Sequence, residues 1–350
     1  MTRALRTDIP APMLNAFATG CSGHELTGDE RAFFKEARPC GLILFKRNCR
    51  DPEQVRRLAG TAAEAVGETS FFVLVDQEGG RVRRLRPPAW RDYPSARKFA
   101  QVYSDDSETG LEAARLSAQL VAADLRAAGI TVNCTPVLDI PVAGAHDIIG
   151  DRAYGSDPES VIALGRAVAE GFLAGGVVPV IKHIPGHGRA RVDSHESLPV
   201  IDTALPDLEA SDFVPFAALR DMPAAMTAHV LMRALDEERP VTVSARIISE
   251  VIRGTIGFEG LLFSDDLGMK ALGGTFAERT REAIAAGCDI ALHCSGDLRE
   301  MQEVAAAAPE LSGKTRQRFE AAFAVTGRVE AMDIERAEAL LARVAGGGDI

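Results

Sequence analysis

The most informative stretch of this chain is Val177-Val178-Pro179-Val180-Ile181, which is followed at once by Lys182-His183-Ile184-Pro185-Gly186-His187-Gly188. The five apolar residues predict a buried strand, and the charged residues begin where that strand is expected to end. In parallel α/β proteins, the carboxyl ends of strands carry the chemistry. The segment continues to Asp193 and His195, so a loop rich in Gly and Pro carries a carboxylate beside an imidazole. Such a loop is typical of a movable general acid or base, with Gly186 and Gly188 absorbing the backbone change.

Short apolar runs of this kind recur along the chain and alternate with helical periodicity. Eight runs predict strands at residues 13–18, 41–45, 71–75, 131–138, 177–181, 224–227, 260–263 and 289–293. Helices are expected at residues 52–66, 110–128, 157–174, 245–255 and 276–286. Helix starts are marked by Asp51-Pro52-Glu53 and by Ser156-Asp157-Pro158-Glu159, which place a capping side chain before a Pro.

This alternation predicts a parallel sheet, and eight strands with their helices predict a closed (β/α)8 barrel. An open doubly wound sheet is the alternative, but no Gly-x-Gly-x-x-Gly follows the first strand. We expect residues 1–350 to form one domain, with extra helices from about residue 297 and a frayed tail at residues 345–350.

The composition narrows the classes of partner. A formal net charge of -11 over 350 residues argues against nucleic acid or an anionic membrane as the main partner. Residues 1–8 contain no apolar run of the signal-peptide kind, and no stretch has the length of a transmembrane helix. The six cysteines are expected to be reduced and mostly buried thiols: Cys21, Cys40, Cys49, Cys134, Cys288 and Cys294. We therefore expect a cytoplasmic protein that is a monomer.

Polar residues follow four of the predicted strands. Asp76 begins a Gly-rich segment after the third run, Asp139 follows the fourth, Lys182 and His183 follow the fifth, and Asp265 follows the seventh. Together they describe a polar pocket at one end of the barrel, with carboxylates, cations and an Asp/His loop, and without a dense cluster of soft metal ligands.

Sugar chemistry suits this set of residues. Carbohydrate hydroxyls need acceptors and donors such as Asp76 and Arg84, and glycosidic cleavage needs one acid and one nucleophile or base. Asp265 is the candidate nucleophile. His195 is a candidate acid, because the carboxylate of Asp193 is placed to raise the pKa of an imidazole and to fix its tautomer.

Five blocks after predicted strands occur in order along residues 10–295. They are Asp76-Gln77-Glu78-Gly79-Gly80-Arg81-Val82, Lys182-His183-Ile184-Pro185-Gly186-His187-Gly188, Asp193-Ser194-His195, Met226-Thr227-Ala228-His229 and Ser264-Asp265-Asp266. Together these blocks resemble the family 3 glycoside hydrolases, and more specifically the bacterial β-N-acetylglucosaminidases of cell-wall recycling.

The resemblance implies a role for each matching residue. It implies that Asp265 is the nucleophile and that His195 is the acid/base, with Asp193 as its partner. The residues that it implies for holding the non-reducing GlcNAc are Asp76, Arg84, Arg152, Lys182 and His183. It further implies a substrate in which GlcNAc is β-linked to 1,6-anhydro-N-acetylmuramic acid, with or without its peptide, and a retaining mechanism without a cofactor.

Departures from the family pattern are small. Ile184 stands where Phe is usual and Gly268 where Ser is common, and neither position supplies a catalytic group. Larger members of that family take their acid/base from a second domain, and the resemblance implies that the Asp193-Ser194-His195 loop takes that role here.

Several of these residues are expected to have a structural role rather than a catalytic one. Asp266 is the alternative to Asp265 as nucleophile, but it is expected to be structural, as are His187 and the thiols of Cys288 and Cys294. Glu78 is expected to bond to the backbone of its Gly-rich turn. Arg189 and Arg191 are expected to be solvated loop charges, while the role of His229 stays open. The spacing of His183, His187 and His195 fits no zinc motif, so we expect no metal.

The sequence therefore predicts a retaining exo-β-N-acetylglucosaminidase that acts on small muropeptides or GlcNAc-containing disaccharides. A phosphorylase of the same fold is the main alternative, because a histidine acid/base does not repel an incoming phosphate. A metal-dependent hydrolase and a catalytically silent sugar-binding barrel are the other classes that remain.

Overall fold

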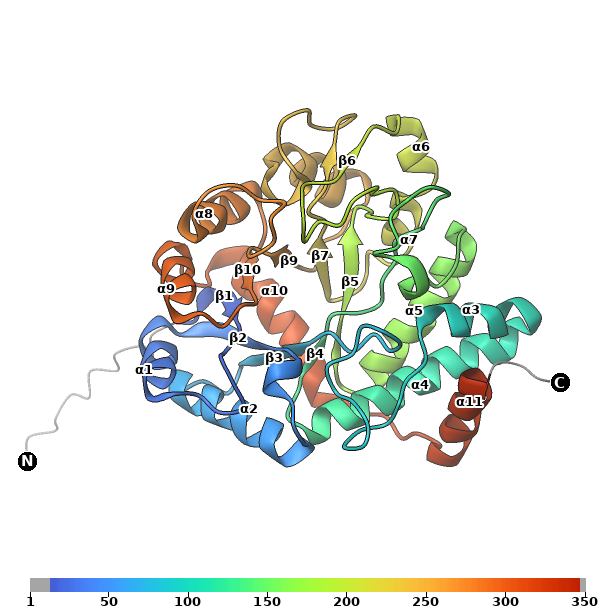
Figure 1. The fold of residues 1–350 in the computed structure, drawn as a ribbon, viewed down its shortest axis with the longest axis horizontal. Coiled ribbons are helices and arrows are strands. Elements are labelled where there is room, and N and C mark those ends of the chain that lie inside the picture. The colour runs from blue at the N-terminus through green and yellow to red at the C-terminus, as the bar shows by residue number, and fades with distance from the viewer. Residues whose placement is uncertain (1–12, 347–350) are drawn as a thin grey trace, which may run out of the picture.

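Eight parallel strands close into a barrel in the computed structural model, which describes residues 13–346 (Figure 1). In the order in which they pair, the strands are β1 (Asn15–Thr19), β10 (Ile290–His293), β9 (Leu261–Asp266), β7 (Ala224–Thr227), β5 (Val178–Ile184), β4 (Val132–Asn133), β3 (Phe72–Val75) and β2 (Pro39–Leu44). Because β1 pairs with both β2 and β10, the sheet has no free edge. The predicted (β/α)8 barrel is confirmed, and the open doubly wound sheet is excluded.

Helices form a ring around the strands (Figure 1). The α-helices are α1 (Gly28–Ala37), α2 (Pro52–Val66), α3 (Ala96–Asp105), α4 (Ser107–Ala127), α5 (Pro158–Ala174), α6 (Leu205–Ala210), α7 (Phe213–Ala218), α8 (Phe276–Ala286), α9 (Leu298–Ala307), α10 (Gly313–Phe323) and α11 (Ile334–Gly346). A π-helix, η4 (Ile247–Thr255), and short 3₁₀ turns at η1 (Lys46–Asn48), η2 (Gly150–Arg152), η3 (Val241–Val243) and η5 (Ala324–Gly327) complete the helical structure. A small parallel pair, β6 (Val200–Ile201) with β8 (Leu231–Met232), lies outside the barrel.

Two helix starts are formed as the sequence predicts. The carboxylate of Asp51 accepts the N–H of Gln54 at 2.8 Å at the start of α2, and that of Asp157 accepts the N–H of Ser160 at 2.9 Å at the start of α5. Each cap is followed by a Pro in the first turn. Local chemistry alone thus sets where these two helices begin.

Three strands differ in length from the prediction by two residues or more, and two of these differences matter for function. β5 runs on to Ile184, so Lys182 and His183 lie within the strand rather than beyond its end. Asp265 and Asp266 are likewise the last two residues of β9. Charged side chains are tolerated there because they find partners inside the mouth of the barrel, which the apolar pattern of a single strand does not reveal. By contrast β4 is shorter than predicted, because Pro136 has no N–H to continue the ladder.

The C-terminal helices pack against the barrel as an added layer. In α10, Phe319 and Phe323 place their rings 4.6 and 5.6 Å from that of Phe72 in β3. Helix α11 is tied to α4 by an ion pair between Arg336 and Glu112. Helices α9, α10 and α11 thus follow the last barrel strand, and Ala345 and Gly346 of the expected frayed tail belong to α11.

Residues 1–12 and 347–350 lie outside the described part of the chain, so the expectations for both ends remain predictions. None of the helices within residues 13–346 combines the length and the apolar composition that crossing a bilayer requires.

Candidate active site

A cavity of about 390 Å³ opens at the carboxyl ends of the barrel strands. This volume lies in the range of small-molecule sites. The expected site residues Asp76, Arg84, Arg152, Lys182, His183, His195 and Asp265 all line it. The structure adds residues that the sequence did not single out for this role: Ile43, Phe45, Glu78, Arg81, Ser194, Met226, Met269 and Cys294.

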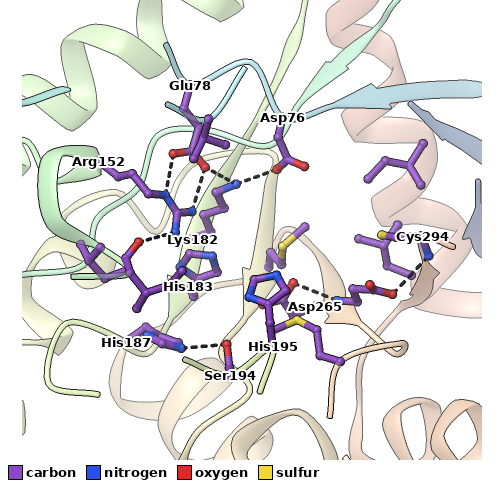
Figure 2. Close-up of a pocket in the computed structure, with 18 of the residues that line it drawn as sticks. Asp76, Glu78, Arg152, Lys182, His183, His187, Ser194, His195, Asp265 and Cys294 are labelled. Carbon is purple, nitrogen blue, oxygen red and sulfur yellow. Dashed lines mark hydrogen bonds and ion pairs between the residues drawn. The ribbon is translucent and has the colours of Figure 1, made fainter. Parts of the chain in front are cut away.

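A buried cluster of charges forms one wall of the cavity. The ammonium of Lys182 lies 2.8 Å from Oδ1 of Asp76 and 2.7 Å from Oε1 of Glu78 (Figure 2). Both oxygens of Glu78 also accept from the guanidinium of Arg152, each at 2.8 Å. The expectation that Glu78 bonds to backbone is wrong, because the loop that carries it folds over the cavity and brings it to two cations that are distant in the sequence.

This pairing keeps the cluster charged. Burial acts to raise the pKa of Glu78, but Arg152 and Lys182 outweigh it and lower the pKa to about 2. Burial acts to lower the pKa of Lys182, but Asp76 and Glu78 raise it well above its usual value. The carboxyl of Asp76 is likewise held well below its usual pKa, because Lys182 and Arg84 overcome the effect of burial. All these groups are therefore ionised at neutral pH.

Arg84 reaches the same wall because Gln77 folds its loop back. The side-chain oxygen of Gln77 accepts the N–H of Arg84 at 2.9 Å, and Asn133 clamps the backbone of Gln77 through two bonds of 2.9 and 3.0 Å. Arg84 then donates from Nη2 to Asp76 at 3.0 Å and stacks over the ring of Phe45. Among the described residues its Nε is buried and has no hydrogen-bond partner.

Asp139 orients two histidines. Its Oδ2 lies 2.6 Å from Nδ1 of His183, and its Oδ1 accepts the backbone N–H of His187 at 2.7 Å. Because a carboxylate only accepts, Nδ1 of His183 carries the proton, which fixes the orientation of the ring. His187 lies deeper, and burial lowers its pKa to about 4, so its ring is neutral at pH 7. The structural role expected for His187 agrees with this burial.

Asp265 and Asp266 are neighbours with different environments. Burial acts to raise the pKa of Asp265, but neighbouring groups, among them the N–H of Asp266 and the ammonium of Lys182, outweigh it, and the pKa of this carboxyl is lowered. Burial raises the pKa of Asp266, although its Oδ1 accepts the N–H groups of Gly268 and Cys294 at 2.9 and 3.2 Å. Both carboxyls line the cavity, but Asp266 uses its Oδ1 to accept backbone N–H groups, and the lowered pKa keeps Asp265 ionised, which favours Asp265 as the nucleophile.

His195 lies at the mouth of the same cavity. Its side chain is 64% exposed, and its Nδ1 lies 2.7 Å from Oδ1 of Asp193. The same oxygen accepts the backbone N–H of His195 at 2.8 Å. Burial acts to raise the pKa of Asp193, but the hydrogen bonds from His195 lower it. The pairing expected between these residues is therefore present, and it uses Nδ1 of His195, so Nε2 can exchange a proton with a ligand.

The loop that carries this pair has a fixed half and an exposed half. Residues 185–190 are mostly buried: a Cβ at Gly188 would lie 1.9 Å from the carbonyl of Ile140, and Arg189 donates to the buried carboxylate of Asp212 at 2.6 Å. Gly188 therefore serves close backbone approach rather than hinge motion, and Arg189 is an anchor rather than a solvated charge. Exposure begins at Arg191.

The remaining expectations concern thiols and metals. All six cysteines are free, and burial raises the pKa of Cys288 to about 12, so it is an inert core thiol. Cys294 is buried as well, but it lines the cavity. Within residues 13–346, no group of three or more His, Cys, Asp or Glu side chains is arranged to hold a metal ion.

Comparison with known proteins agrees with this geometry. Residues 18–328 match the family model described as the glycosyl hydrolase family 3 N terminal domain. The chain is 40% identical over 287 residues to a β-hexosaminidase of Alkalilimnicola ehrlichii, covering 81% of each chain. It is 38% identical over 319 residues to a β-hexosaminidase of Chromobacterium violaceum, covering 90% of this chain and 87% of the relative. Its fold is similar, with a TM-score of 0.86 and 30% identity, to that of NagZ from Neisseria gonorrhoeae in complex with N-trifluoroacetyl-D-glucosamine, covering 96% of this chain and all of that one.

Proposed function

The chain belongs to glycosyl hydrolase family 3 and is a β-N-acetylhexosaminidase, and on this premise we propose that it removes terminal β-linked GlcNAc from small peptidoglycan fragments. One observation carries the assignment: an ionised Asp265 and an imidazole held by Asp193 line the same cavity. A retaining glycosidase needs this combination of a nucleophile and a separate proton donor.

In the first step, Asp265 attacks the anomeric carbon of the sugar. His195, protonated, gives the proton on Nε2 to the departing glycosidic oxygen, while Asp193 holds Nδ1. The carbon–oxygen bond of the substrate breaks as the bond to Asp265 forms, and this leaves a glycosyl-enzyme and a neutral His195.

In the second step, the same imidazole acts in reverse. Neutral His195 takes a proton from a water molecule, which attacks the anomeric carbon and frees the carboxylate of Asp265. Two inversions at one carbon give net retention of configuration. His195 ends protonated and ready for the next turnover.

The pairing of charges in the wall supports a neutral sugar as the group held beside Asp265. Lys182, Arg84 and Arg152 each form an ion pair with Asp76 or Glu78. Paired groups of this kind keep lone pairs and N–H groups that can bind sugar hydroxyls.

The finer substrate, GlcNAc linked to 1,6-anhydro-N-acetylmuramic acid with or without its peptide, rests on the family resemblance. It is further supported by the exposure of His195, which leaves the leaving-group side of the cavity open for a large aglycone. We place this reaction in the cytoplasm and assign it to a monomer, which cell fractionation and light scattering would test.

The deciding experiment follows release of an aryl group from β-GlcNAc and β-glucose substrates, with phosphate and a chelator each varied. Turnover of the β-GlcNAc substrate but not of the β-glucose substrate, unaffected by phosphate or chelator, supports the proposal. Release of a sugar 1-phosphate only when phosphate is present would instead support the phosphorylase, which the β-hexosaminidase relatives do not favour. The GlcNAc–anhydro-N-acetylmuramic acid disaccharide, with and without its peptide, then tests the aglycone.

A further inference from the structure

We propose that His229, Thr242 and Thr227 are positioning residues that fix the backbone carrying Asp265. The proposal rests on the proposed function, because it takes Asp265 to be the nucleophile. None of the three has a polar atom assigned to the sugar, so they would act through the segment that carries the nucleophile rather than on the substrate.

A continuous chain of hydrogen bonds links these residues. The N–H of Asp265 donates to Oγ1 of Thr227 at 3.3 Å, and that oxygen lies 2.7 Å from Oγ1 of Thr242. Oγ1 of Thr242 lies 2.7 Å from Nδ1 of His229. Nε2 of His229 lies 3.0 Å from the carbonyl oxygen of Asp266. The chain therefore begins on one side of the Asp265–Asp266 peptide and returns to its other side.

The direction of each bond follows from its partners. A carbonyl oxygen only accepts, so Nε2 of His229 carries the proton, and burial lowers the pKa of this histidine, which keeps the ring neutral. Nδ1 must then accept from the hydroxyl of Thr242. The carbonyl of Ala228 is a second acceptor for that hydroxyl, but it lies farther away, at 3.2 Å.

The hydroxyl of Thr227 consequently donates to Thr242 and accepts from Asp265. Every donor and acceptor between the N–H of Asp265 and the carbonyl of Asp266 is thus satisfied in one order only. Reversing any bond would leave a buried polar group unpaired, which costs more than a weak bond returns.

Burial makes this arrangement stiff. Thr227, Thr242 and His229 are all 0% exposed, so water does not compete for their hydrogen bonds. They come from two separate segments, since Thr227 and His229 lie at and just beyond the end of β7 and Thr242 lies in the turn η3, and they converge on the end of β9. Only a small displacement of Asp265 is needed to weaken its attack, because nucleophilic steps depend steeply on distance and alignment.

Paired substitutions at Thr242 test the proposal in the full chain with an aryl β-GlcNAc substrate. Thr242→Val removes the hydroxyl at constant volume, and Thr242→Ser retains it. We expect Thr242→Val to lower kcat by roughly 100-fold with KM nearly unchanged, as for a misplaced reacting group, and Thr242→Ser to restore most of kcat.

Thr280→Val is the matched control. Thr280 is also fully buried, and its hydroxyl donates within α8 to the carbonyl of Phe276 at 2.7 Å. The same substitution there should leave kcat unchanged while removing a buried hydroxyl of the same kind. Thermal unfolding of each variant reports whether a loss of turnover follows a loss of fold.

A second pair keeps the test decisive if Thr242→Val does not fold. His229→Gln keeps a donor near the carbonyl of Asp266, and His229→Leu removes it. We expect kcat to be retained far better in the Gln variant.

Unchanged kcat in folded Thr242→Val and His229→Leu, or a rise in KM alone, would overturn the proposal. Asp265→Asn separates this failure from that of the proposed function. If Asp265→Asn abolishes turnover while Thr242→Val and His229→Leu turn over normally, only the positioning role fails. If Asp265→Asn retains wild-type turnover, the nucleophile assignment fails and the positioning role falls with it.

Discussion

Oδ1 of Asp193 lies 2.7 Å from Nδ1 of His195 and accepts the backbone N–H of the same residue at 2.8 Å. One carboxylate oxygen thus fixes both the ring and the main chain of an otherwise exposed histidine. Because a carboxylate cannot donate, the proton of the imidazole is held on Nδ1, and Nε2 is the nitrogen that exchanges its proton with substrate and water.

Replacing Asp193 by Asn should therefore damage turnover more than binding. An amide can present its N–H₂ to Nδ1 and so favour the wrong tautomer. We expect kcat to fall by roughly 10²- to 10⁴-fold, the range that general acid–base catalysis contributes, with KM little changed. Steady-state kinetics on an aryl β-GlcNAc substrate measures this. Asp202→Asn, at an exposed ion pair with Arg233, is the control and should leave kcat as it was.

The buried contact of Glu78 with Lys182 and Arg152 should make stability depend on acid pH. Since its pKa is lowered to about 2 from an unfolded value of about 4.3, Glu78 stabilises the fold fully above the unfolded value. This stabilisation is lost as the pH falls toward about 2. Glu78→Gln, which leaves both cations short of a partner, should lower the free energy of unfolding by roughly 3 kcal/mol at pH 7.

Urea denaturation of the wild type and of Glu78→Gln at pH 7 and at pH 3 checks this prediction. The difference in unfolding free energy between the two proteins should shrink at the lower pH. A difference that is equal at both values would contradict the assigned pKa of Glu78.

Asp289 ties the far end of the barrel to the C-terminal helices. It is buried at the start of β10, where its two oxygens accept from Leu262 N, Arg253 Nη2, Thr315 Oγ1 and Arg318 Nη1 at 3.0, 2.8, 2.8 and 3.1 Å. Asp289→Ala leaves two largely buried guanidinium groups without this partner. We expect a loss of roughly 3–5 kcal/mol in unfolding free energy.

A comparison with Glu259→Ala makes this test specific. Glu259 pairs with Arg318 as well, but its side chain is 72% exposed, so its removal should cost less than about 1 kcal/mol. Because both residues lie at the amino ends of the strands, KM should not change in either folded variant. Equal losses in the two variants would show that burial of Asp289 is not what matters.

Gly188 is the clearest case of close approach near the catalytic loop. A methyl group there would lie 1.9 Å from the carbonyl oxygen of Ile140, so the backbone of one segment must move. We predict that Gly188→Ala lowers both stability and kcat, because the displaced segment leads to Asp193 and His195. Thermal unfolding and kinetics on one preparation measure both effects.

At Gly60 the same substitution to Ala should raise stability instead of lowering it. It is exposed within α2, and a Cβ there meets no atom within 4 Å. Gly60→Ala should therefore stabilise the protein by about 0.5–1 kcal/mol through the preference of Ala for helix, without altering kcat. A stabilised Gly188→Ala, or a destabilised Gly60→Ala, would contradict the packing described.

Much of the site was predictable because strand ends in a parallel barrel converge. Asp76, Lys182, His183 and Asp265 each follow or end an apolar run, and that position alone places them at one mouth of the barrel. Glu78 was misjudged because its partners, Lys182 and Arg152, lie more than 70 residues away in the sequence. No local pattern reveals such a pairing.

The eight barrel strands, the helix starts at Asp51 and Asp157, and the order of the motifs could be predicted from the residues in order, because they depend on apolar periodicity and on hydrogen bonds between residues close in the chain. The folded chain was needed to show that Glu78 pairs with Lys182, that Arg189 bonds to Asp212, and that the pKa values of Asp265 and Asp266 shift in opposite directions. These properties arise from burial and from charges brought together across the barrel. Both depend on where distant segments meet rather than on the identity of neighbouring residues.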